Sequence, residues 1–98
     1  MSNDLIIRPA AEEEIRQAYL WYEERRKGLG DDFLLCLEET FEKINSNPLL
    51  FQVIHKNIRR ALIQRFPYGI FYIIDKGRVV IVAVFHGNRD PKKWKQRM

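Results

Sequence analysis

Two apolar runs separated by a short turn near the end of the sequence constrain the fold more than any other feature. Residues 69–74 and 79–85 consist largely of β-branched, aromatic and other apolar residues, a composition typical of strands. The turn between them contains Gly77, which can adopt the positive φ that a two-residue hairpin turn requires. These features predict a β-hairpin. Because residues 79–85 form the most apolar run, we expect them to be the central strand of the sheet.

The beginning of the sequence predicts one short strand and a first helix. Residues 5–8 form an apolar, β-branched run ended by Pro9, which indicates an N-terminal strand. Proline is also favoured in the first turn of a helix, and apolar residues recur with helical spacing after it. We therefore expect a helix over residues 9–26. The acidic triplet at residues 12–14 falls in its first turn, where negative charge complements the helix dipole.

A second helix is predicted after a break that contains glycine. Gly28 and Gly30 interrupt the first helix, and Asp31 or Asp32 is a good N-cap for the next one. Apolar residues then recur with helical spacing as far as Ile44, and the Asn-Ser-Asn-Pro sequence that follows stops the helix. Because the break is short, we expect the two helices to form an antiparallel hairpin.

The middle of the sequence predicts a connection and one further strand. Residues 49–57 have no clear period, and we interpret them as a connection that packs onto the core. Residues 58–65 predict a strand, which residues 66–68 separate from the hairpin. The order is therefore β-α-α-β-β-β in a single domain over residues 1–98. This is an α+β fold, with a helical hairpin packed on a mostly antiparallel, twisted sheet.

Basic side chains are concentrated in the second half of the chain. Residues 1–47 carry 11 acidic and 6 basic side chains, a balance of −5. Residues 48–98 carry 2 acidic and 11 basic side chains, a balance of +9. This asymmetry indicates a basic surface with an anionic partner, either a nucleic acid or an acidic protein.

Composition argues against several other classes of protein. The single cysteine, Cys36, excludes an intramolecular disulfide, and we expect it to be a buried core residue. With only His55 and His86 in the sequence, and no phosphate-binding loop, we expect no metal and no cofactor. No apolar run approaches the roughly 20 residues that span a bilayer, and the N-terminus lacks the features of a signal peptide. We therefore expect a cytoplasmic protein without membrane contact.

The candidate functional residues are basic and aromatic side chains of the second half. Strand alternation places Arg59 and Arg60 on opposite faces, with Arg65 on the face of Arg59. His86 ends a neighbouring strand, within reach of the same surface. This set is interpreted either as a basic face that binds phosphates or as charges that protect an edge strand from aggregation. The end of the sequence adds further candidates for target or nucleic-acid binding, namely Arg89, Lys92, Lys93, Trp94, Lys95 and Arg97. The indole among these lysines is either a docking ring or, as we prefer, a lid over the core.

His86 is the candidate for acid–base chemistry, because the pKa of histidine lies near neutrality. Ribonuclease chemistry would require a base for the ribose 2′-hydroxyl, an acid for the leaving oxygen and cations around the phosphate. The second half has many cations, but its only acidic residues are Asp75 and Asp90, which we interpret as a turn residue and a cap. Catalysis therefore lacks a convincing second acid–base partner.

Several segments follow one another in a characteristic order. They are RRAL at residues 59–62 with FPYGIFY at 66–72, VVIVAVFH at 79–86, and RDP at 89–91 followed by Trp94. Arg-Pro-Ala-Ala before the first helix and Asn-Pro after the second extend the pattern. In this order the sequence resembles the RelE/ParE toxin superfamily of bacterial type II toxin–antitoxin modules, over nearly the whole chain.

The resemblance implies a cytoplasmic toxin that is neutralised by a cognate antitoxin, which wraps an extended or helical segment over it. A homodimer and a heterotetramer with the antitoxin are the candidate assemblies. ParE-like members poison DNA gyrase and are not nucleases, whereas RelE-like members cut mRNA on the ribosome. The ending after His86 looks more ParE-like, and no tyrosine follows Tyr72, unlike in several nuclease members. We therefore expect a ParE-like toxin that inhibits DNA gyrase.

Two alternatives remain open at this point. The first is a ribosome-dependent mRNA endoribonuclease of the RelE type, with His86, Arg60 and Arg65 as its catalytic residues. Whether the protein is an enzyme depends on this choice. The second is a family member that is not toxic and only binds its partner.

Overall fold

The hairpin near the end of the sequence lies at the centre of the structure, a computed structural model that describes residues 4–87. Strands β4 (Tyr68–Asp75) and β5 (Arg78–His86) pair antiparallel. The two turn residues between them, Lys76 and Gly77, have φ angles of 52° and 79°. Positive φ at both positions matches the twist of the flanking strands, so the predicted hairpin is confirmed.

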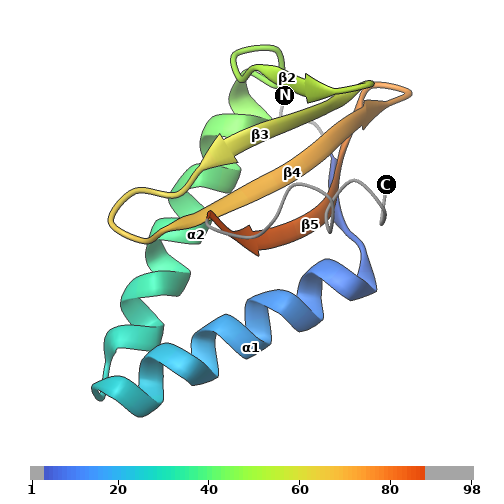
Figure 1. Cartoon of the computed structure of the whole chain (residues 1–98). Helices are drawn as coiled ribbons and strands as arrows, with labels where there is room; N and C mark the ends of the chain where they lie inside the picture. Colours follow the sequence, from blue (N-terminus) through green and yellow to red (C-terminus); the bar gives the residue numbers. More distant parts are fainter. Residues whose placement is uncertain (1–3, 88–98) are drawn as a thin grey trace.

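Three further strands complete a five-stranded sheet in the order β1-β5-β4-β3-β2 (Figure 1). The first strand, β1 (Leu5–Ile7), pairs in parallel with β5. Strands β2 (Val53–His55) and β3 (Ile58–Leu62) extend the other side of the hairpin with antiparallel pairing. The middle position therefore belongs to β4, and the prediction that residues 79–85 form the central strand is wrong by one position.

The predicted α+β fold is confirmed, with one strand more than the sequence indicated. This strand, β2, lies within residues 49–57, which were interpreted as a connection. Its three residues are too few to show an alternating pattern, and its pairing with β3 includes a register shift. Strand β3 is also shorter than predicted, because it ends at Leu62 and leaves Arg65 in the following turn.

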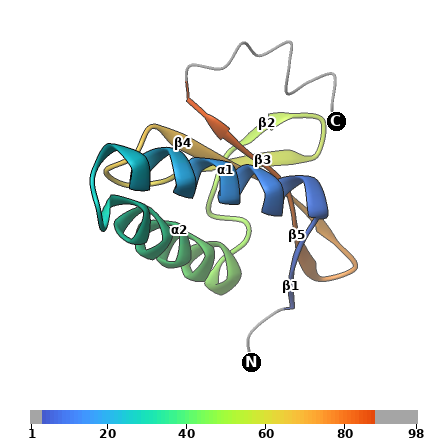
Figure 2. The same ribbon diagram turned by 90° about the horizontal axis from the view of Figure 1, so that it is seen from below.

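Helices α1 (Pro9–Arg25) and α2 (Leu29–Ser46) cover one face of the sheet and diverge from their shared turn (Figures 1 and 2). The predicted helical hairpin is thus present, in a splayed form. Pro9 occupies the start of α1, where its missing N–H costs no helical hydrogen bond.

The turn between the helices is capped differently from the prediction. Gly28 is the N-cap of α2 with a φ of 90°, so Asp31 and Asp32 lie inside the first helical turn. The carboxylate of Glu23 on α1 accepts hydrogen bonds from the backbone N–H groups of Gly28, at 2.9 Å, and Gly30, at 3.0 Å. One side chain of α1 therefore caps the N-terminus of α2.

The main core lies between the helices and the sheet. Phe33 and Ile44 from α2 and Tyr72 and Ile81 from the sheet are fully buried in it. Cys36 is buried there too, as predicted. At the end where the helices meet, the core is an aromatic cluster with ring centroids 4.9–6.1 Å apart, formed by Tyr22, Phe33, Phe66 and Tyr68.

A change of register in the hairpin decides which side chains of β5 face the helices. Tyr72 pairs with Ile81, but its neighbour Phe71 pairs with Ala83, so β5 contains one extra residue at this point. Before the shift Ile81 belongs to the helix-side core, and after it Val84 does. A bulge of this kind reverses the alternation of faces, and it turns the end of β5 toward α1.

Candidate functional site

The arginines of the candidate basic face do not share one surface. The Arg59 guanidinium donates hydrogen bonds to the backbone carbonyl oxygens of Phe51, at 2.6 Å, and Leu49, at 3.4 Å. It therefore fastens the segment before β2 to the helix side of the sheet. Arg60 is exposed on the opposite face, where its strand position pairs with Phe71 of the second apolar cluster.

Arg65 lies on neither face of β3. It occupies the turn after the strand with a φ of 71°, which removes it from the alternation that linked it to Arg59. Its guanidinium lies 3.9 Å from the carboxylate of Asp32 at the start of α2. The Arg65 side chain is 64% exposed and that of Asp32 is 38% exposed, so this long ion pair contributes little to stability. The expected common surface of Arg59 and Arg65 is thus not found.

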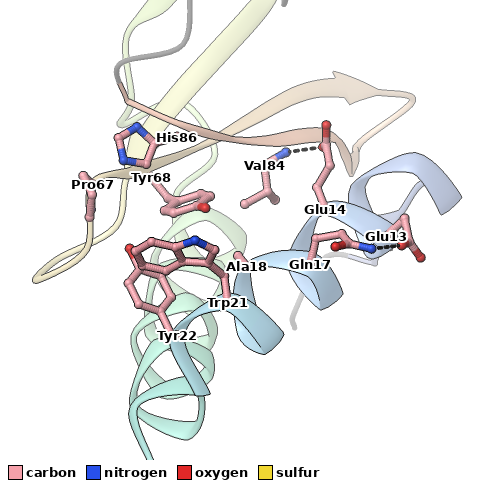
Figure 3. A pocket seen from close by; sticks show the side chains of 10 residues that line it. All are labelled: Glu13, Glu14, Gln17, Ala18, Trp21, Tyr22, Pro67, Tyr68, Val84 and His86. Atoms are coloured by element: carbon pink, nitrogen blue, oxygen red, sulfur yellow. Dashed lines mark hydrogen bonds between the residues drawn. The ribbon is translucent and has the colours of Figure 1, made fainter. Parts of the chain in front are cut away.

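His86 lies on the helix side of the sheet, away from Arg60. Its ring meets the ring of Tyr68 edge to face, with centroids 5.3 Å apart. The charged residues that line the same pocket are Glu13 and Glu14, at its other end (Figure 3). The structure therefore does not bring His86 together with Arg60 and Arg65.

The remaining sequence candidates, Arg89, Lys92, Lys93, Trp94, Lys95 and Arg97, lie outside the described residues. Their roles in target or nucleic-acid binding stay predictions, as do those of Arg59, Arg60, Arg65 and His86.

The structure instead shows a pocket between α1 and the end of β5 (Figure 3). Its volume is about 800 Å³, within the range of small-molecule and cofactor sites. One wall is α1, and the other is formed by the end of β5 and the start of β4. The lining residues are Glu13, Glu14, Gln17, Ala18, Trp21, Tyr22, Pro67, Tyr68, Val84 and His86.

Aromatic and small apolar side chains form the floor of this pocket. Ala18 and Tyr22 are buried on α1 and Val84 is buried on β5, while Tyr68 stands between them (Figure 3). The Tyr22 hydroxyl is protonated at neutral pH, as for any tyrosine, and burial raises its pKa further. The floor is therefore uncharged and suited to an apolar side chain.

Trp21 forms the exposed rim of the pocket. Its side chain is 50% exposed although it lies edge to face against Tyr22 at 5.1 Å. The Arg25 guanidinium stacks over the indole, 3.9 Å from the ring centroid, a cation–π contact that limits the motion of the ring. A large, pre-positioned aromatic ring at the edge of a pocket is typical of an energetic hot spot for binding.

Two adjacent carboxylates of α1 play different parts at the other end of the pocket. Glu13 lies on the helix surface, where Arg16 and Gln17 donate hydrogen bonds to it. The bond from Arg16 lowers the pKa of Glu13 to about 2. Glu14 reaches across to the sheet, and its Oε1 accepts a hydrogen bond of 2.9 Å from the backbone N–H of Val84 (Figure 3).

The sequence reasoning missed this pocket. The triplet at residues 12–14 was interpreted through the helix dipole, and Trp21 and Glu14 were not selected as site residues. A partial signal existed in the residue type alone, because tryptophan is enriched among the residues that dominate binding interfaces. The pairing of that helix with the end of β5 gave no sequence signal.

The described part of the chain offers no metal site and no membrane segment. No three His, Cys, Asp or Glu side chains within residues 4–87 are grouped so as to hold a metal ion. Neither described helix has the length and apolar character of a membrane-spanning segment. The pocket has an apolar floor, an aromatic rim and carboxylates at one end.

Comparison with known proteins identifies relatives of this sequence and fold. A sequence model of the family described as "ParE toxin of type II toxin-antitoxin system, parDE" matches residues 5–91, nearly the whole chain. A solved structure described as "Chromosomal ParDE TA system from P. aeruginosa" superposes with a TM-score of 0.76 at 11% sequence identity. The match covers 86% of this chain and 95% of that chain, and at this identity it shows a shared fold. Curated protein sequences yielded no match.

Proposed function

Because the chain belongs to the ParE toxin family of type II toxin–antitoxin systems, we propose that it acts by inhibiting DNA gyrase in the cytoplasm. It is a ParE-like type II toxin with a cognate antitoxin as its partner. Membership of the family does not by itself identify the target, because the superfamily also contains ribosome-dependent nucleases. The target therefore has to be identified by experiment.

The separation of His86 from the arginines supports gyrase over RNA as the target. Cleavage of RNA requires a proton-transfer group within hydrogen-bond reach of the ribose, and cations around the same phosphate. In the described residues, Arg60 faces away from the helices, and His86 lies on the helix side with Glu13 and Glu14. The carboxylates that line the same pocket as His86 disfavour the binding of a phosphate in it.

Paired activity assays test this choice. Purified toxin should inhibit the supercoiling of relaxed plasmid by DNA gyrase, and it should leave ribosome-bound mRNA intact. Cleavage of mRNA with no effect on supercoiling would instead establish the nuclease. If neither activity is found, and induced expression does not slow growth, the chain is a family member that only binds its partner.

We also propose that the pocket between α1 and β5 receives the antitoxin. The observation that carries this assignment is Trp21, half exposed and held in place by Arg25 at the edge of an apolar pocket. A soluble partner that buries such a ring gains a large apolar area at little entropic cost. In this proposal the antitoxin binds the pocket, and gyrase binds another surface of the chain, in its basic second half.

Substitution of Trp21 tests the assignment of the pocket. Trp21→Ala should weaken antitoxin binding by about 2 kcal/mol or more, roughly 30-fold in Kd, as measured by calorimetry. Leu20→Ala is the matched control, because Leu20 is the adjacent residue of α1, is 40% exposed and does not line the pocket. Equal affinities for the two variants would place the antitoxin elsewhere.

A further inference from the structure

The face of the sheet opposite the helices, the far face, carries two exposed side chains at the end of β3. Ile58, Arg60 and Leu62 share this face, because alternate residues of a strand point to the same side. Ile58 is buried in the second apolar cluster, whereas Arg60 is exposed and Leu62 is 63% exposed. The end of β3 therefore presents a cation and an apolar side chain to solvent, next to each other.

A glycine on the neighbouring strand leaves room for the Arg60 side chain. Gly69 of β4 pairs with Leu62, so it also belongs to the far face. A Cβ added at Gly69 would lie 3.3 Å from both Cγ and Cδ of Arg60, and 3.5 Å from Cε1 of Phe71. The aliphatic stem of Arg60 therefore crosses β4 over Gly69, in the space that any other side chain would fill.

The guanidinium at the end of this stem is available to a partner. Arg59 donates to backbone carbonyls, and Arg65 forms an ion pair with Asp32. Within residues 4–87, no group binds the Arg60 guanidinium in either way. A side chain whose stem is already packed loses less entropy when a partner binds, and a guanidinium matches a carboxylate with paired hydrogen bonds. Arg60 is thus a pre-positioned cation suited to an acidic partner.

We propose that Arg60 and Leu62 contact gyrase, and that Gly69 is the positioning residue that holds Arg60 for this contact. The inference rests on the proposal that gyrase is the target. The group that fits is a carboxylate of the gyrase protein beside an apolar side chain, which packs on Leu62. DNA fits less well, because its binding relies on several cations side by side, and the adjacent Arg59 is turned to the helix side.

Inhibition of gyrase supercoiling by wild type, Arg60→Ala, Gly69→Val and the double variant tests the role of Gly69. Position 69 lies within a strand, where valine is favoured, and the new side chain would occupy the path of the Arg60 stem. Half-inhibition should require about tenfold more Arg60→Ala toxin, the effect of one charged hydrogen-bonded pair. It should require about fivefold more Gly69→Val toxin, because the cation is kept but no longer positioned. The double variant should be no weaker than Arg60→Ala, since Gly69 acts only through Arg60.

Three results of this assay would overturn the inference. Gly69→Val may inhibit as well as wild type, or the two single effects may multiply in the double variant, so that Gly69 acts independently of Arg60. The third result concerns the matched control Arg78→Ala, which removes the same charge from an exposed position at the start of β5. Arg78→Ala should inhibit like wild type, and a loss as large as that of Arg60→Ala would mean that only net charge matters. Urea unfolding and antitoxin binding check the fold of each variant.

Calorimetry with gyrase alone distinguishes a carboxylate from a phosphate. In the absence of DNA, Arg60→Ala should raise the Kd for gyrase about tenfold, and Leu62→Ala should raise it about threefold. If Arg60→Ala changes the Kd only when gyrase holds DNA, the partner group is a phosphate and the inference is wrong. Wild-type affinity of Leu62→Ala would remove the apolar part of the contact.

A measurement on the free toxin does not depend on the target. Relaxation of the arginine Nε nuclei, measured by NMR, should show that Arg60 is more restrained than Arg78 in wild type, and equally mobile in Gly69→Val. Equal mobility in wild type would refute the positioning of Arg60 by Gly69. If Arg60 is restrained but wild-type toxin neither binds nor inhibits gyrase, the proposed function is wrong, and the gyrase contact is overturned with it.

Discussion

The carboxylate that joins the two helices is the most informative position for testing the fold. Glu23 accepts hydrogen bonds from the N–H groups of Gly28 and Gly30 at 2.9 and 3.0 Å, and both bonds are partly buried. Replacing one N-cap acceptor costs about 0.5–2 kcal/mol. Glu23→Ala removes two such bonds and a negative charge at a helix N-terminus, which contributes a further ~0.5 kcal/mol. Because water replaces part of the lost bonding, we expect a destabilisation of about 2 kcal/mol.

Glu23→Gln should have a smaller effect, because its amide oxygen can still accept one hydrogen bond. We expect about half the loss, roughly 1 kcal/mol. Thermal and urea unfolding measure both values, and about 2 kcal/mol corresponds to a decrease in Tm of about 8–16 °C for a domain of this size. Glu24→Ala is the matched control, since Glu24 is the adjacent, exposed residue of the same helix. If Glu23→Ala and Glu24→Ala unfold at the same urea concentration, Glu23 does not cap α2.

Two further substitutions test the packing. A Cβ added at Gly30 would lie 2.8 Å from both the ring and the carbonyl oxygen of Tyr19. Overpacking of about 1–3 kcal/mol should therefore outweigh the gain in helix propensity of about 1 kcal/mol, and a Gly30→Ala variant at least as stable as wild type in urea would contradict the close approach of the helices. Tyr72 donates a hydrogen bond of 2.6 Å to the carbonyl of Pro48, so Tyr72→Phe should lose about 1 kcal/mol of stability at pH 7. Burial raises the pKa of Tyr72 above 10.0. Its contribution is therefore complete below that pH and decreases above it, where the unfolded chain ionises first. Unfolding between about pH 9 and 11 should show a shallower loss of stability for Tyr72→Phe, and equal slopes would refute the assignment.

Local patterns in the sequence were sufficient for the elements, but not for their ends. The hairpin around Gly77 and both helices follow from apolar periodicity, turn residues and Pro9, all of which act within a few residues. The cap of α2 depends instead on Glu23, a side chain of the other helix. Strand β2 depends on its pairing with β3. Interactions between elements leave no periodic trace in a single sequence.

The candidate site was harder to predict, for three identifiable reasons. Arg65 left the predicted strand because β3 ends early, and Arg59 is occupied by the backbone carbonyl of Phe51. The register shift between β4 and β5 turned His86 toward α1, although strict alternation from Ile81 would have placed it on the other face. Composition and charge do not reveal a single extra residue in one strand. Here that residue moved His86, on which the acid–base hypothesis depended, to the other face of the sheet.

The parallel pairing of β1 with β5 also bears on how the protein folds in the cell. Leu5 pairs with Val79, so the first strand to be synthesised must wait for the last of the described strands before it acquires its neighbour. Closing so long a loop carries an entropic cost and slows folding. During translation the two helices are complete while the sheet beneath them is still missing strands, which leaves their apolar faces exposed to aggregation. During synthesis there is therefore a period in which α1, one wall of the pocket, has formed but β5, the opposite wall, has not.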